Sequence, residues 1–122
     1  MTEICSIHHA SLIVSSVEAS RFFYHELLGL DIAERPDLPF PGIWLKIGEQ
    51  QLHLLELPNP DPVDGRPEHG GRDRHLALLV HDLERLAEAL DQAGVLFTRS
   101  KSGRAALFCR DPDGNALEFI QI

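Results

Sequence analysis

Histidine is the residue type in this chain with the clearest capacity for chemistry. Seven histidines occur among 122 residues, against one Trp and one Tyr. Imidazole is the commonest metal ligand in proteins and the side chain that titrates near neutral pH. Two of the seven open the same pattern, H-x-x-L-x-V, at His9–Val14 and again at His75–Val80. A carboxylate, Glu118, follows the turn sequence Asp-Pro-Asp-Gly-Asn near the end of the chain.

Strand alternation predicts that these three side chains share one surface. Every second residue of three predicted strands is apolar and is expected to face a helix. These apolar residues are Ala10, Leu12, Val14, Leu76, Leu78, Val80, Leu117 and Phe119. His9, His75 and Glu118 then point to the opposite side. Two imidazoles and one carboxylate with open positions suit a divalent zinc, nickel, cobalt, iron or manganese ion, without choosing among them.

A fourth ligand is expected from the strand predicted over residues 51–57, which carries both His53 and Glu56. These two have opposite parity, so a regular strand cannot aim both at the same side. His53 follows the turn glycine Gly48 by five residues, and Glu118 follows Gly114 by four. The two positions therefore align if the turns differ by one residue. We therefore favour His53, with Glu56 as the alternative if a bulge shifts the register.

The remaining histidines and the arginines have simpler interpretations. His8 is expected to be partly buried at a strand edge, and His25, His69 and His81 to be solvated. Five arginines could neutralise an anionic substrate, although solvation is the default for each: Arg66, Arg72, Arg74, Arg99 and Arg104.

Two similar sets of elements would position the site. A strand, a capped amphipathic helix and three further strands are predicted in each half. The first helix begins at Ser15 or Ser16 and the second at Asp82, all good N-cap residues. The predicted domain spans residues 1–122, with module one at 7–57, a linker at 58–73 and module two at 74–122. Each half is too short to fold unaided, so we expect an α+β fold of two βαβββ modules whose curved mixed sheet surrounds a cleft.

Charge and composition exclude several partners. The chain has 11 Lys and Arg residues against 19 Asp and Glu, a net charge of -8, so nucleic acid is not an expected partner. No apolar run is long enough to span a membrane, and no basic stretch precedes an apolar core at the N-terminus. With only Cys5 and Cys109 present, a cytoplasmic protein with reduced thiols is expected.

The doubled plan, the two H-x-x-L-x-V segments and D-P-D-G-N-x-L-E at 111–118 resemble the vicinal oxygen chelate superfamily. This superfamily includes glyoxalase I, bleomycin-resistance proteins, fosfomycin-resistance enzymes and extradiol dioxygenases, and the resemblance covers nearly the whole chain. It implies that His9, His75 and Glu118 bind a metal. In glyoxalase I a glutamate before the linker is a fourth ligand and the catalytic base, and that position falls here on His53 or, by local pattern, on Glu56.

The resemblance also implies a function. In this superfamily the metal binds two adjacent oxygens of a small substrate and acts as a Lewis acid. We expect a metal-dependent glyoxalase-like lyase or isomerase in which His53 and Glu118 take part in catalysis, and the resemblance implies a homodimer. The alternatives are a bleomycin-resistance-like protein that sequesters a small molecule, in an apolar cleft around Trp44 and Phe108, and a thiol transferase or dioxygenase of the same superfamily.

Overall fold

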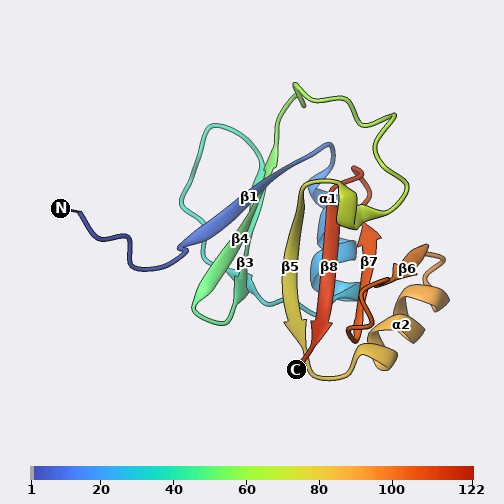
Figure 1. Ribbon diagram of the computed structural model, residues 1–122. Coiled ribbons are helices and arrows are strands. Elements are labelled where there is room, and N and C mark those ends of the chain that lie inside the picture. Colours follow the sequence, from blue (N-terminus) through green and yellow to red (C-terminus); the bar gives the residue numbers. More distant parts are fainter. Residues whose placement is uncertain (1) are drawn as a thin grey trace. The chain divides into compact units, whose positions relative to one another are not determined.

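The computed structural model describes residues 2–122, which divide into two compact units (Figure 1). The first unit ends at Asn59 and the second begins at Pro60. Each unit contains a strand, a helix and three further strands in that order. The prediction of an α+β fold built from two βαβββ modules is confirmed.

The first unit forms a mixed sheet with the strand order β1-β4-β3-β2. In it, β1 runs parallel to β4 and the other pairs are antiparallel. Leu45, Leu52 and Leu54 are buried on the side that faces the helix. The elements are β1 (His9–Val14), α1 (Val17–Arg21), the π-helix η1 (Phe22–Leu27), β2 (Ile32–Ala33), β3 (Gly42–Ile47) and β4 (Gln50–Glu56).

The second unit repeats this arrangement with the strand order β5-β8-β7-β6. Again the first strand, β5, pairs in parallel with the last, β8. Leu107, Leu117 and Phe119 are buried on its helix side. The elements are the 3-10 helix η2 (Gly70–Arg72), β5 (His75–Val80), α2 (Leu83–Gln92), β6 (Phe97–Arg99), β7 (Ala106–Arg110) and β8 (Ala116–Gln121).

Some elements are shorter or wound differently than the sequence predicts. Strand β2 is only Ile32–Ala33, because the prolines that follow lack the N–H needed to extend a ladder. The first helix widens into a π-helix, in which the Leu28 N–H donates to the Phe23 carbonyl. None of the helices in residues 2–122 is long and apolar enough to cross a membrane.

In each unit, the last residue of the strand that pairs in parallel with the first strand caps the helix. These strands are β4 and β8. In the first, the Val17 N–H donates to Oε1 of Glu56 at 2.8 Å. In the second, the Leu83 N–H donates to Oε1 of Gln121 at 3.0 Å. Ser16 is the N-cap residue itself, which decides between the two serines that the sequence left open. These contacts satisfy helix N–H groups that have no partner within the helix.

The segment that follows Pro60 packs on the second unit. Asp73 accepts hydrogen bonds from Arg66 and Arg110, and Arg110 also donates to the backbone carbonyls of Pro67 and Gly114. The hydrogen bond from Arg110 is the main reason that the pKa of Asp73 lies below its ordinary value. This ion-paired cluster holds η2 against β7, so that a Cβ at Gly71 would lie 3.1 Å from the Phe108 ring.

The shared capping contact gives a test of the duplicated architecture. Glu56→Ala and Gln121→Ala each remove the acceptor of a helix N–H, so each should lower the free energy of unfolding by about 1 kcal/mol. Glu56→Gln keeps an amide oxygen, as in the second unit, and should lose less than half as much. Chemical denaturation measures all three. If Glu56→Gln and Glu56→Ala are equally destabilising, the hydrogen bond is not what Glu56 contributes.

Candidate metal centre

His75 and Glu118 meet on one face of the second sheet. Nε2 of His75 lies 3.2 Å from Oε1 of Glu118. Nδ1 of His75 donates to the backbone carbonyl of Asp73 at 2.9 Å, because a carbonyl can only accept. In the neutral ring, Nε2 therefore carries a lone pair, and it faces a carboxylate oxygen that also carries lone pairs. Such a pair is stable when a cation, either a proton or a metal ion, lies between the two atoms.

The same pair fits a metal ion in distance and in chemistry. Two donors that each lie about 2.0–2.1 Å from a tetrahedral zinc ion are separated by about 3.3 Å. A metal-binding imidazole usually donates its other N–H to a carbonyl or a carboxylate, as His75 does to Asp73. Glu118 is 5% exposed, so its carboxylate needs the polar partners that surround it.

The first unit presents a row of stacked rings. The rings of Trp44 and His53 are 3.9 Å apart at an interplanar angle of 2°, and those of His53 and His9 are 4.0 Å apart at 17°. These residues lie on β3, β4 and β1. Nε2 of His53 donates to Oε1 of Gln51 at 2.8 Å, and the Nδ1 atoms of His8 and His9 are 2.8 Å apart. His8, expected to be partly buried, is exposed.

The strand register separates His53 from Glu56. Pairing along β4 is regular, so His53 lies on the face of His9 and Glu56 lies on the helix side, where it caps α1. His53 pairs with Ser11 two residues after His9. Glu118 pairs with Ala77 two residues after His75, so His53 and Glu118 occupy equivalent positions in the two units.

Burial is the main reason that the pKa of His53 lies below its ordinary value, and the charges of His9, His8 and Arg35 lower it further. Only 6% of His53 is exposed. A neutral imidazole is the form that accepts a proton or binds a metal. The first unit thus holds His53 in its reactive form at neutral pH.

Each unit therefore supplies one pair of the predicted residues. His9 and His53 come together in the first unit, and His75 and Glu118 in the second. Over residues 2–122, neither unit gathers three His, Cys, Asp or Glu side chains around one point.

His69 is a residue near this site that sequence reasoning missed. Expected in solvent, it instead packs against Phe108 with the ring centroids 4.8 Å apart. Its Nδ1 accepts from the Gly71 N–H at 3.0 Å, and its Nε2 is buried with no partner among the residues described. The two glycines after His69 were the available signal, because they allow η2 to approach β7 closely.

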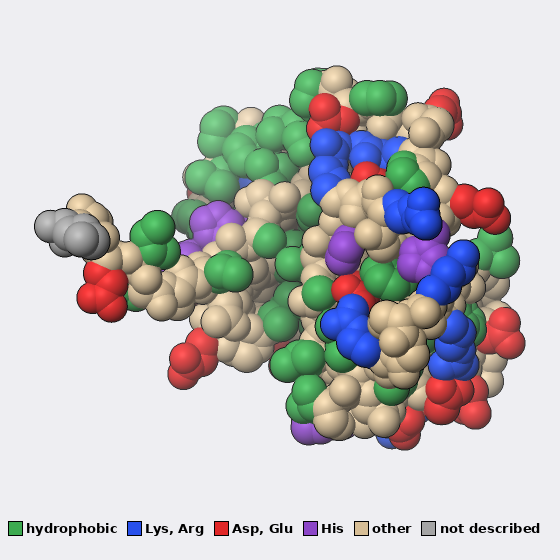
Figure 2. Space-filling view, in the orientation of Figure 1, with side chains coloured by type: hydrophobic (Ala, Val, Ile, Leu, Met, Phe, Trp, Pro, Cys, Tyr) green, Lys and Arg blue, Asp and Glu red, His purple; other side chains and the backbone are tan. Residues whose placement is uncertain are grey.

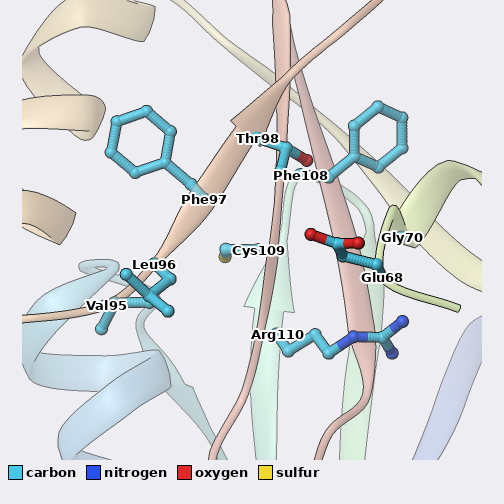
Figure 3. A pocket seen from close by; sticks show the side chains of 9 residues that line it. All are labelled: Glu68, Gly70, Val95, Leu96, Phe97, Thr98, Phe108, Cys109 and Arg110. Carbon is cyan, nitrogen blue, oxygen red and sulfur yellow. The ribbon is translucent and has the colours of Figure 1, made fainter. Parts of the chain in front are cut away.

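An apolar pocket lies at the edge of the second sheet, next to strands β6 and β7. It has a volume of about 610 Å³, and Phe108, which lines it, lies 5.4 Å from the His75 ring. Figure 3 shows the side chains that line it. The lining residues are Glu68, Gly70, Val95, Leu96, Phe97, Thr98, Phe108, Cys109 and Arg110. The pocket can hold an apolar group, and Phe108 is the lining residue that also contacts His75.

A comparison with protein families identifies the class to which this geometry belongs. The family model for the glyoxalase/bleomycin resistance protein/dioxygenase superfamily matches residues 6–119. The chain belongs to this superfamily, as its sequence motifs indicated.

Relatives with different names are similar over nearly the whole chain. A protein named lactoylglutathione lyase from Haemophilus influenzae is 32% identical over 94% of this chain and 91% of its own length. Glutathione transferase FosA from Serratia marcescens is 34% identical, covering 93% of this chain and 78% of that protein. A glyoxalase family protein from Bacillus anthracis superimposes with a TM-score of 0.82 at 23% identity, covering 99% of this chain and 98% of that one, which shows the shared fold.

The lowered pKa of His53 predicts a pH dependence of stability in the metal-free protein. The unfolded chain takes up the proton at a pH of about 6.5, before the folded chain does, so stability falls as the pH drops below that value. NMR should show the ring of His53 titrating below pH 6.5. Between pH 7 and pH 5, urea denaturation should show a larger loss for the wild type than for His53→Gln. A His53 ring that titrates above the unfolded value contradicts this.

Burial, assisted by the charge of Asp111, raises the pKa of Cys109 to about 12. The thiolate is the reactive form, so Cys109 should resist thiol reagents while the exposed Cys5 reacts. Thiol titration should find one reactive group in the folded chain and a second only after denaturation. A Cys5→Ser variant that still reacts fast when folded would show that Cys109 is accessible.

Proposed function

We propose that the protein is a metal-dependent lyase or isomerase of the glyoxalase type. His75 and Glu118 hold a divalent cation, His9 supplies a third ligand, and His53 is the fourth ligand or the base. The observation that carries this proposal is the 3.2 Å contact between Nε2 of His75 and Oε1 of Glu118. Glu56 has no part in it, since its carboxylate caps α1.

The residues divide the work by their charge and hydrogen bonding. A bound cation would act as a Lewis acid on two adjacent oxygens of a small substrate. The Asp73 carbonyl keeps Nε2 of His75 free to bind the cation, and Glu118 supplies the negative charge. His53, which is neutral and stacked on the Trp44 ring, can accept a proton from the substrate. The pocket at Phe108 holds the apolar part of the substrate away from water.

A thiol transferase is a second candidate for the same residues. It is favoured by the 34% identity to glutathione transferase FosA, which exceeds the 32% identity to lactoylglutathione lyase. The two reactions differ in the fate of the thiol. A transferase consumes it stoichiometrically, whereas a lyase or isomerase acts on a thiol adduct that is already formed.

We further propose a cytoplasmic homodimer that acts on a small molecule and, at a net charge of -8, does not bind nucleic acid. A dimer raises the question of whether His9 joins His75 of its own chain or of a second copy. Mixing inactive His9→Ala and His75→Ala proteins decides this. Mixed dimers regain about half of the sites' metal only if each site takes ligands from two copies.

Metal analysis is the central test of the proposed function. After reconstitution with Ni²⁺ or Zn²⁺, the wild type should hold one ion per chain, and His75→Ala and Glu118→Gln should each lose tenfold or more in affinity. His81→Ala, which removes an exposed imidazole outside the site, is the matched control and should retain the metal. The loaded protein should then be screened with hemithioacetals of 2-oxoaldehydes, epoxides with added thiol, and catechols.

The alternative of a sequestering protein predicts tight binding without turnover and indifference to chelators. A wild type that takes up no stoichiometric metal, or a His75→Ala variant with unchanged metal affinity, would falsify the proposal.

A further inference from the structure

Arg104 lies at the solvent-facing edge of the Glu118 carboxylate. Its Nη2 donates to Oε2 of Glu118 at 2.9 Å, while Oε1 faces His75. The side chain of Arg104 is 57% exposed, whereas that of Glu118 is 5% exposed. The guanidinium therefore reaches from solvent to one oxygen of a buried carboxylate. The other oxygen of that carboxylate is the proposed metal ligand.

Most of the hydrogen-bonding capacity of Arg104 is unused. A guanidinium has five N–H donors, and within residues 2–122 the contact with Glu118 is the one hydrogen bond that the guanidinium of Arg104 makes. Two other arginines near this sheet, Arg99 and Arg110, are engaged by structural partners. Arg99 forms two hydrogen bonds with Glu84 on α2, and Arg110 binds Asp73 and two backbone carbonyls. Arg104 is thus free to bind a further group from solvent.

The loop that carries Arg104 has a second cationic side chain, in a protein that is negative as a whole. Figure 2 shows Lys and Arg side chains near His side chains over the second unit, with Asp and Glu side chains among them, and the net charge of the chain is -8. Arg104 and Lys101 both lie on the loop between β6 and β7. A local positive field of this kind attracts anions.

The charges at the proposed centre do not balance without an anion. Its imidazoles are neutral when they bind a metal, and the single negative charge of Glu118 is offset by Arg104. A divalent cation would then bring two uncompensated positive charges to a carboxylate that already carries a cation, which is electrostatically unfavourable. An anionic ligand that contacts both the cation and Arg104 removes this conflict.

We propose that Arg104 is a substrate-binding residue and that the substrate is an oxyanion, with a carboxylate or similar charged oxygen beside its second chelating oxygen. This inference rests on the proposed function, because the same Glu118 must hold the metal. It narrows the substrate class from any molecule with two adjacent oxygens to one that is negatively charged. The free N–H groups of Arg104 bind the charged oxygen, as planar guanidinium groups commonly do.

Oxalate and oxamate provide a matched pair of probes. Both present two adjacent oxygens to a metal, but oxalate is a dianion and oxamate a monoanion. Calorimetry on the Ni²⁺-loaded protein should show that Arg104→Gln weakens oxalate binding about tenfold, the effect of one charge-assisted hydrogen bond at a partly exposed site. Oxamate binding should weaken less. Arg104→Lys, which keeps the charge, should restore part of the preference for oxalate.

A control on the same loop and a separate metal measurement keep the two proposals distinguishable. Lys101→Gln removes a nearby positive charge that does not touch Glu118 and should leave oxalate binding within about twofold. Ni²⁺ affinity of the Arg104→Gln protein should be unchanged or higher, because a like charge has been removed from the carboxylate.

Wild-type oxalate affinity in the Ni²⁺-loaded Arg104→Gln protein overturns the role of Arg104 while leaving the proposed function intact. Loss of Ni²⁺ from the Arg104→Gln protein also overturns the substrate-binding role of Arg104, since Arg104 would then only support Glu118. A wild type that binds no Ni²⁺ removes the proposed function and this inference with it.

Discussion

The second unit is organised around an electrostatic constraint, the meeting of two electron-rich atoms. Nε2 of His75 faces Oε1 of Glu118 at 3.2 Å, and only a cation can make that contact favourable. Everything around the pair maintains it. The Asp73 carbonyl fixes the imidazole tautomer, Arg66 and Arg110 hold Asp73, and the parallel pairing of β5 with β8 sets the distance.

The duplicated modules use equivalent positions for related purposes. The strand-end residues Glu56 and Gln121 both cap a helix, so these two positions serve the fold. On the other face, His53 and Glu118 occupy matching positions, each beside an aromatic residue of the neighbouring strand. The equivalent position thus carries an imidazole in the first unit and a carboxylate in the second.

Two buried side chains of the second unit, Glu118 and Cys109, differ in the polarity of their surroundings. Glu118 is buried but has charged partners, whereas Cys109, buried in apolar surroundings, has its pKa raised to about 12 and is held as an unreactive thiol. The two side chains lie on opposite faces of the sheet, because Glu118 pairs with Phe108 and not with Cys109. Because side chains alternate along a strand, the Cys109 thiol points away from the face that carries the proposed metal ligands.

The sequence by itself determined the order of the elements, the duplication, and the side of its own sheet on which each of His9, His75 and Glu118 lies. These follow from local rules, since alternation and capping are set by residues a few positions apart. The tertiary structure decided which side chains contact one another across elements. The contact of Arg104 with Glu118, the packing of His69 against Phe108 and the use of Glu56 as a helix cap all join residues from different elements. Such contacts depend on how strands pair and loops fold back, which no short-range pattern encodes.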